Sequence, residues 1–494
     1  ARGMRAHLSF EAVGVGKTPS ARILRFRNVE TENGYLPDPL VPVEGRFDLP
    51  PGGTSVQDRN YTSLLVEVYV PKGAPPGSHR GALHLDYAGE SLAVGVKLNV
   101  WDFDLPDRLS FIPQMNAYYH LPGAQAELDY YRLAHRHRTC LNVLPYGWRG
   151  RIQDGRAPAF DGDKYDWRQF DRRFGPLLDG RAFEGSPRGA VPVEAFYLPL
   201  NENWPVPIDE GFQGGYWAEE ALSSDYRRRF VEACRGFARH LAERGWTHTV
   251  FEFYLNNKVS FKKEGWDRCS APWMFDEPVN TQDFWALRWY GLAFHEGIRP
   301  FRDRLRAAFR CDISRPQWQR NLLDGVMNVN VVGGVYQQYL RRVLRRKRRW
   351  NQIVYNYGSP NPIGKSNVHG TVWCIDSWAR GVDGVIPWQT VGRADSWQSA
   401  DRQALLYPPR TGDGSVPHPS ARLKSYRRGQ QDVEYMVLLT HALGRDRSEV
   451  GEWVLARLGL KSRRQCVRAR EWEGGFNEID PVALWRLRTR VGHY

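Results

Sequence analysis

The pattern of apolar and polar positions divides the chain into two regions. Over residues 1–100, short runs that alternate or are rich in β-branched residues are separated by turns such as Lys72–Gly77. The predicted strands here are His7–Val15, Ala21–Val29, Leu64–Pro71, Arg80–Tyr87 and Ser91–Val100. Short strands with regular Gly- and Pro-rich turns and no helical period indicate an antiparallel β-sandwich.

From Phe111 onward, apolar runs of strand length alternate with runs of helical period. We predict helices over Asp225–Arg244, Asp283–Ile298 and Val335–Arg345. We predict strands over Phe111–Asn116, Thr139–Pro145, Glu194–Asn201, Thr249–Asn256, Ala307–Ile313, Gly325–Val332, Gln352–Gly358 and Gly384–Thr390. Strands that alternate with helices are typical of parallel βα units, and this number favours a (β/α)8 barrel. A doubly wound sheet is the alternative, although no Gly-x-Gly-x-x-Gly opens its first helix.

The 494 residues are too many for one compact core, so several domains are expected. The patterns predict an antiparallel β-sandwich over 1–106, a (β/α)8 TIM-like barrel over 107–430 and a C-terminal helical extension over 431–494. The stretch Trp101–Pro106 would close the last strand of the sandwich and lead into the barrel.

One apolar run in the barrel region ends on two adjacent carboxylates. Trp273–Pro278 predicts a buried strand, or a re-entry into the fourth strand position after an insertion at Lys258–Ala271. Asp276 and Glu277 would then lie at the carboxyl end of a barrel strand, where barrel enzymes carry their chemistry. Acids before a proline also begin many helices, so this pair alone does not establish a site.

Other predicted strands also end in polar or aromatic residues. Carboxylates, amides, phenols and indoles at one face of a barrel are the groups that a sugar-cleaving site needs. The candidate substrate-binding residues are Asn201, Glu202, Trp204, Asn256, Tyr355, Tyr357, Trp373 and Trp388.

The adjacency of Asp276 and Glu277 restricts the mechanism. In the common retaining mechanism two carboxylates flank the sugar about 5–5.5 Å apart, which sequence neighbours rarely achieve. Adjacent acids fit substrate-assisted catalysis, in which Glu277 protonates the leaving oxygen and Asp276 holds the 2-acetamido group of the substrate. The alternative is a two-glutamate retaining enzyme that uses Glu202, but the late strand Gln352–Gly358 contains no Glu for a nucleophile.

The charge balance allows an acidic partner. The chain carries 69 Lys and Arg against 55 Asp and Glu, a net charge of +14. The basic run Arg341–Arg349 could attract a polyanion, or it could be the solvated face of a helix whose Tyr336, Leu340 and Leu344 point inward. No nucleic-acid-binding motif accompanies it, so a glycan, including an acidic one, is the expected partner.

We expect no metal or other cofactor. The six cysteines form no Cys-x-x-Cys pair, and His135 and His137 would face different directions on a helix.

No apolar stretch is long enough for a membrane span, and Ala1–Arg5 carries no signal core. A secreted or periplasmic location is expected if the chain start is processed, and a cytoplasmic one otherwise; the oligomeric state stays open.

Three ordered stretches resemble glycoside hydrolase family 123 and its wider relatives. They are Val100–Pro106, then Phe275–Pro278, and then a long run that passes from Gly381–Trp388 through Gly412–Gly414 and Ser420–Leu423 to Arg428–Tyr435. The resemblance implies a sandwich followed by a (β/α)8 barrel. It also implies release of β-linked N-acetylgalactosamine by a retaining, substrate-assisted route.

The resemblance assigns roles to particular residues. Glu277 would be the general acid/base and Asp276 the acetamido-orienting group. Tyr355 or Tyr357 would bind the acetamido group, and Trp388 would form the floor of the sugar site. The chain departs from the family pattern in its insertion and around Pro387, so other N-acetylated or acidic sugars stay open. A glycan-binding protein without catalysis is the competing class.

Overall fold

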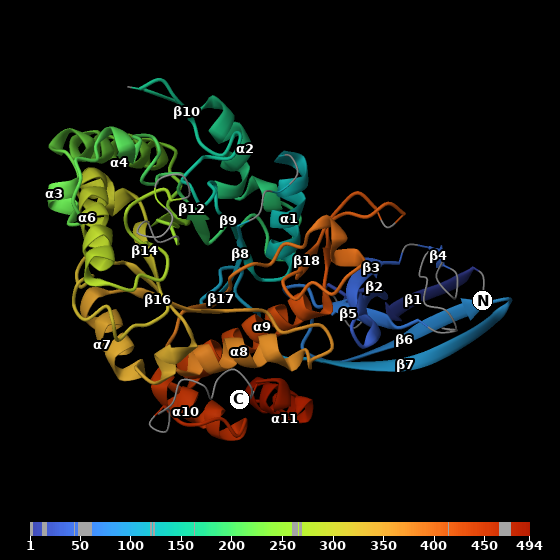
Figure 1. Ribbon diagram of the computed structural model, residues 1–494. Helices are drawn as coiled ribbons and strands as arrows, with labels where there is room; N and C mark the ends of the chain where they lie inside the picture. The colour runs from blue at the N-terminus through green and yellow to red at the C-terminus, as the bar shows by residue number, and fades with distance from the viewer. Residues whose placement is uncertain are drawn as a thin grey trace.

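The computed structural model describes residues 3–11, 17–43, 45–47, 62–118, 121, 124–162, 164–258, 265, 269–412, 414–463 and 476–494. It confirms the predicted fold class. An antiparallel sandwich precedes an eight-stranded parallel barrel, and further helices follow the barrel (Figure 1).

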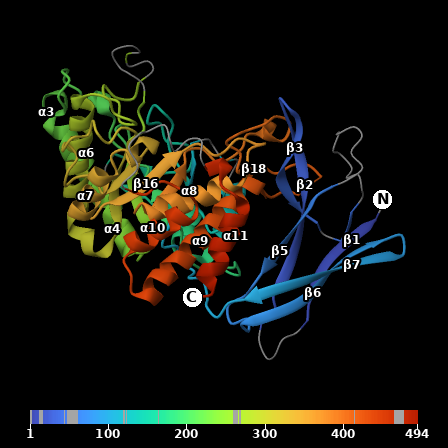
Figure 2. The same cartoon turned by 90° about the horizontal axis from the view of Figure 1, so that it is seen from below.

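The sandwich consists of two antiparallel sheets. One has the order β4 (Arg46–Phe47), β1 (Met4–Phe10), β6 (Gly77–Tyr87) and β7 (Glu90–Val100). The other has the order β3 (Gly34–Pro42), β2 (Ser20–Thr31) and β5 (Leu64–Tyr69). The prediction omitted β3, whose prolines are typical of turns, and residues 12–16 of the predicted first strand lie outside the described residues. The long strands β6 and β7 extend away from the barrel (Figure 2).

All eight predicted barrel strands are confirmed, most of them shorter than predicted. They are β8 (Ile112–Ala117), β9 (Cys140–Val143), β12 (Ala195–Tyr197), β13 (Val250–Tyr254), β14 (Ala307–Ile313), β15 (Val329–Val332), β16 (Ile353–Gly358) and β17 (Gly384–Pro387). Each strand pairs in parallel with the next along the sheet, and β17 pairs with β8. Between β9 and β12 the link is a side chain, because the Tyr197 N–H donates to Asn142 Oδ1 at 2.9 Å.

Helices surround the barrel (Figure 1). The barrel helices are α1 (Ala124–Arg136), α2 (Arg168–Leu178), α4 (Ser224–Glu243), α6 (Thr281–Ile298), α7 (Leu340–Trp350), α8 (Val368–Ala379) and α9 (Ala421–Leu443). The C-terminal helices are α10 (Arg447–Arg457) and α11 (Pro481–Gly492). Short elements in the loops are α3 (Ala218–Ala221), β10 (Ala159–Phe160), β11 (Tyr165–Asp166), β18 (Leu406–Tyr407) and β19 (His418–Pro419).

Helix α9 joins the barrel to the sandwich. The predicted boundary at 430 and 431 falls inside this helix, which runs unbroken to Leu443. Arg422 forms an ion pair with Asp38 of β3 at 2.9 Å, and both side chains are buried. Lys424 lies 2.6 Å from Glu67 of β5. The Ser420–Leu423 stretch, which belongs to the third of the stretches that resemble family 123, therefore contacts strand β3 of the sandwich and links the two domains.

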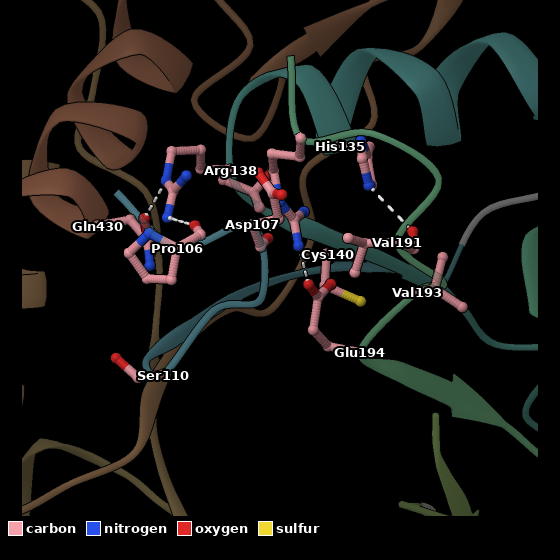
Figure 3. Close-up of polar contacts among 12 residues, drawn as sticks. Pro106, Asp107, Ser110, His135, Arg138, Cys140, Val191, Val193, Glu194 and Gln430 are labelled. Carbon is pink, nitrogen blue, oxygen red and sulfur yellow. Dashed lines mark hydrogen bonds and ion pairs between the residues drawn. The ribbon is translucent and has the colours of Figure 1, made fainter. Parts of the chain in front are cut away.

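The middle of α9 fixes the linker between the domains (Figure 3). Arg138 donates to the Gln430 side chain at 2.5 Å and to the Pro106 carbonyl at 2.9 Å. Glu434 accepts from the Ser110 N–H at 2.9 Å and from its hydroxyl at 2.6 Å. The Arg428–Tyr435 stretch is thus structural, and it anchors the chain just before the first barrel strand.

The basic run lies on α7, which begins at Leu340 and ends at Trp350, five residues later than the helix predicted over Val335–Arg345, because Gly334–Gln337 forms a separate 3-10 turn. The helix is amphipathic, as one of the two interpretations of the run requires. Leu340, Val343 and Leu344 are buried, whereas Arg341, Arg342, Arg345, Arg348 and Arg349 are exposed. The two remaining cations turn inward, where Arg346 pairs with Asp324 at 3.0 Å and Lys347 with Asp383 at 2.5 Å.

Among the described residues, no helix combines the length and the hydropathy that crossing a membrane requires. The same residues contain no group of three or more His, Cys, Asp or Glu side chains placed to hold a metal ion. Five of the six cysteines are described, and each is a buried thiol outside any disulfide: Cys140, Cys234, Cys269, Cys311 and Cys374.

Candidate active site

The segment that carries Asp276 and Glu277 is a loop, so the predicted strand at Trp273–Pro278 is wrong. Trp273 and Phe275 are fully buried, as the apolar pattern requires, but they pack against helical side chains such as Tyr290. The N–H groups of Phe275 and Asp276 donate to the Asn257 carbonyl, at 2.8 and 3.1 Å, instead of entering a ladder. An apolar run between two prolines has the same pattern whether it pairs or only packs.

Hydrogen bonds link this loop to the carboxyl ends of two adjacent barrel strands. Just after β13, the Asn257 side chain donates to the Trp273 carbonyl at 2.6 Å. The Glu277 N–H donates to the Asp312 carbonyl in β14 at 3.1 Å. Glu277 itself has φ of +54°, a left-handed conformation that costs a non-glycine residue about 1–3 kcal/mol and is concentrated at functional sites. The pair therefore sits at the mouth of the barrel in a strained, well-anchored turn.

Asp283, at the start of α6, holds the other side of this loop. Its buried carboxylate accepts from the N–H groups of Met274 at 3.0 Å, Val279 at 3.3 Å and Asn280 at 3.2 Å. The Asn280 side chain accepts in return from the Asp283 N–H at 3.1 Å, which completes a capping box. The first turn of α6 thereby fixes the backbone on both sides of the acid pair.

Two donors from other parts of the barrel reach the pair. The Tyr357 hydroxyl, from β16, donates to Glu277 Oε1. Lys258 Nζ lies 2.7 Å from Glu277 Oε2 and 3.6 Å from Asp276 Oδ2. Both oxygens of Glu277 therefore accept from donors.

Asp276 titrates differently from an ordinary carboxyl group. Burial raises its pKa to about 7; the ammonium ion of Lys258 opposes this shift, and the charges of Asp312 and Glu277 add to it. Burial lowers the pKa of Lys258, but the charges of Asp276 and Glu277 outweigh burial and raise it above its ordinary value. Perturbed carboxyl groups of this kind are concentrated at functional sites.

A buried ionic cluster lies inside the barrel below the pair. Arg310 binds both carboxylate oxygens of Asp312, at 2.8 and 3.0 Å, and donates to Glu252 at 2.9 Å. Its guanidinium group also lies over the rings of Tyr197 and Tyr254, at 4.9 and 5.0 Å. Since Asp312 is fully engaged by this fork, it neutralises Arg310 and is not free to attack a substrate.

Aromatic side chains form one wall of the mouth. Tyr118, which follows β8, lies with its ring centroid 6.3 Å from that of Trp388, which follows β17. Its N–H donates to Gln389 Oε1 at 2.8 Å, and the Trp388 indole donates to Ser359 Oγ at 3.0 Å. Asp276 is close enough to Tyr118 to contribute to raising its pKa, although burial is the main cause. A half-buried indole and a phenol beside two acids form a surface suited to a sugar ring.

Comparison with known proteins supports this arrangement at the level of the fold. No family model and no curated protein matches the sequence. Among solved structures, the chain is similar to a family 123 glycoside hydrolase from Clostridium perfringens, with 12% identity, a TM-score of 0.60, and coverage of 100% of this chain and 89% of that one. The chain therefore shares the fold of that enzyme.

Other solved glycoside hydrolases are more distant. A β-D-glucuronidase from Dictyoglomus thermophilum has 8% identity and a TM-score of 0.34, with 86% of this chain and 68% of that one covered. A family 39 glycoside hydrolase from the gut symbiont Bacteroides cellulosilyticus WH2 has 10% identity and a TM-score of 0.39, with coverage of 87% and 80%.

Within this fold, four of the predicted site residues come together: Asp276, Glu277, Tyr357 and Trp388. The other tyrosine, Tyr355, is buried in the apolar interior of the barrel, where its ring packs against Gly384. Trp373 lies in helix α8, and its buried indole donates to Asn356 Oδ1 at 2.5 Å. Tyr355 and Trp373 therefore do not line the mouth.

The residues predicted after the third strand also serve the scaffold. Asn201 accepts from the Asn203 N–H at 2.8 Å within a tight turn. The Glu202 carboxyl is buried and accepts from the Ser270 hydroxyl, and burial raises its pKa. The Trp204 ring packs against Phe237 of α4.

Asn256, after β13, is buried near the site, and its amide nitrogen has no hydrogen-bond partner among the described residues.

Sequence reasoning missed three residues that shape the site. Lys258 is the first residue of the insertion, and Tyr118 lies just beyond the predicted first strand. Their positions after strand ends could have marked both as candidates. Asp283 could have been found from the spacing Asn280-x-x-Asp283, which is typical of a capping box.

A cavity of about 350 Å³ lies between the neighbouring loops of the same barrel face. None of the predicted site residues lines it; its lining is Arg149, Asn203, Asp209, Phe212, Cys269 and Ser270. Two of these lining residues are hydrogen-bonded to each other, because the Asn203 amide donates to the Ser270 carbonyl at 2.9 Å.

Proposed function

We propose that this protein is a retaining glycoside hydrolase that releases a β-linked N-acetylhexosamine, with N-acetylgalactosamine favoured, by substrate-assisted catalysis. The observation that carries the proposal is the acid pair itself. Asp276 and Glu277 are adjacent, partly exposed and anchored at the mouth of the barrel. Adjacent acids fit a reaction in which one acid moves a proton and the other orients a nucleophile supplied by the substrate.

Each residue then has a defined task. Asp276 accepts the N–H of the 2-acetamido group and aims its carbonyl oxygen at the anomeric carbon. Glu277 donates a proton to the leaving oxygen as the carbonyl oxygen attacks, and an oxazolinium intermediate forms. Glu277 next takes a proton from water, which opens the intermediate and restores the original anomeric configuration. In this proposal Tyr357 would bind the acetamido oxygen, and Trp388 would support the sugar ring.

The other carboxylates near the site support this division of work. A two-carboxylate retaining enzyme needs a second carboxylate that can attack the sugar. Asp312 is held by Arg310, and Glu202 is enclosed with Ser270. The fold shared with the Clostridium perfringens enzyme, whose structure concerns glycolipid glycan hydrolysis, also supports a glycan as the substrate.

The anomeric form of the first product tests the mechanism. We expect ¹H NMR of a fresh reaction on an aryl β-N-acetylhexosaminide to show the β-anomer before mutarotation. A thiazoline that mimics the cyclised intermediate should inhibit the reaction. A protein that binds the sugar without releasing it would be a glycan-binding protein, and an α-anomer as first product would exclude the proposed mechanism.

A further inference from the structure

Lys258 has no role in the reaction proposed above, although it lies close to both acids. Its ammonium ion lies between the two acids, 2.7 Å from Glu277 and 3.6 Å from Asp276. Its side chain is 40% exposed, whereas that of Asp276 is 15% exposed and that of Glu277 24%. A single cation therefore faces both carboxylates and has room to move between them.

In this structure the ammonium ion of Lys258 lies closer to the acid that must donate a proton in the first step. Both oxygens of Glu277 accept hydrogen bonds, from Tyr357 and Lys258. Asp276 lies farther from the ammonium ion, and burial raises its pKa to about 7. In the proposed reaction Glu277 must donate a proton and Asp276 must accept the acetamido N–H, so the cation is needed on Asp276.

We propose that Lys258 is a two-position switch for the acid pair, whose ammonium ion lies on Glu277 in this structure and moves onto Asp276 when the 2-acetamido sugar binds. This inference rests on the proposed function. The proton that leaves the Asp276 carboxyl group goes to the Glu277 carboxylate, so the three groups keep one ammonium ion and one carboxylate throughout. Lys258 then stabilises ionised Asp276, and Glu277 is free to act as the acid.

Among the described residues, the other charged and titratable groups around the pair cannot replace Lys258. Arg310 is a buried cation below the site, but Asp312 and Glu252 already hold its guanidinium group. Asp312 and Glu277 both raise the pKa of Asp276, so they oppose its ionisation. The remaining titratable neighbours in the described part of the chain are phenols from three other segments of the barrel: Tyr118, Tyr254 and Tyr357.

The pH profile of kcat/KM tests the switch in the full-length protein. We compare the wild type with Lys258→Met and Lys258→Arg on an aryl β-N-acetylhexosaminide. Loss of the cation should move the acid limb, which reports ionisation of Asp276, to higher pH by about one unit or more. Lys258→Arg keeps the charge and should leave the limb near its wild-type position. A Lys258→Met profile that is lower at every pH with unchanged midpoints would show a merely structural role and overturn the proposal.

A second measurement does not depend on turnover. The pH dependence of thermal unfolding is recorded for the same proteins, each against its Asp276→Asn counterpart. In the wild type, Asp276 should cost stability increasingly as the pH rises from 3.8 to about 7. In Lys258→Met this loss should continue to higher pH. Equal midpoints would refute the coupling between Lys258 and Asp276; a shifted midpoint without any turnover would refute the proposed function but keep the coupling.

Discussion

Replacing Glu277 by Gln should lower kcat about a thousandfold on substrates with poor leaving groups, the scale that a lost general acid costs. The amide cannot donate the proton that the leaving oxygen needs, whereas its shape preserves the contact with Tyr357. Aryl glycosides with acidic phenols, which leave without protonation, should lose much less in the step that forms the intermediate. Steady-state kinetics on a series of aryl β-N-acetylhexosaminides with leaving groups of different pKa measures this dependence.

Glu296→Gln is the matched control. Glu296 lies on α6, where it pairs with Arg227 at the surface at 2.8 Å, and its replacement should leave kcat unchanged. A Glu277→Gln enzyme whose loss is the same for all leaving groups would contradict the assignment of Glu277 as the acid.

Replacing Asp276 by Asn should lower activity and raise stability at the same time. The amide cannot hold the acetamido N–H as a carboxylate does, so we expect a loss of about 10²–10³ in kcat, the usual scale for one preorganised polar contact. At pH 8 the free energy of unfolding of Asp276→Asn should exceed that of the wild type, because the wild type then carries a charge in a largely buried position. The shift of the Asp276 pKa from 3.8 to about 7 is about 3 units, worth on the order of 2–4 kcal/mol.

The sign of this stability effect depends on pH. A carboxyl group with a raised pKa in the folded state binds its proton more tightly there, so stability is highest below pH 3.8 and falls as the pH rises to about 7. The gain from Asp276→Asn should therefore be large at pH 8 and small at pH 4 in urea unfolding. The exposed Asp225→Asn, whose carboxylate pairs with Arg228 at the surface, should show no such trend. An Asp276→Asn enzyme with full activity would remove the acetamido-orienting role.

The barrel could be predicted from the sequence because its strands are continuous apolar runs bounded by polar residues. The same rule failed at Trp273–Pro278, whose buried Trp273 and Phe275 pack without pairing. Burial pattern reports which side chains are inside, but it does not report where the backbone hydrogen bonds go. In this loop they go to Asn257, Asp283 and Asp312.

The site was predictable only in part, for a related reason. Tyr355 and Tyr357 are two residues apart on β16, so their side chains point to the same face of the strand. Their depth differs, and only Tyr357 reaches the mouth. Lys258 and Tyr118 lie beyond strand ends, where periodicity no longer says in which direction a side chain points. The acid pair was found because adjacency itself carries a chemical meaning.

The most direct test of the central claim compares two aryl β-glycosides that differ only at carbon 2, one with a 2-acetamido group and one with a 2-hydroxyl group. Substrate-assisted catalysis needs the acetamido oxygen as the nucleophile, and the described residues of the site, where Asp312 is held by Arg310 and Glu202 by Ser270, offer no carboxylate that is free to take its place. We therefore predict turnover of the acetamido substrate and none above background for its 2-hydroxyl partner. Comparable kcat/KM values for the two substrates would contradict the account.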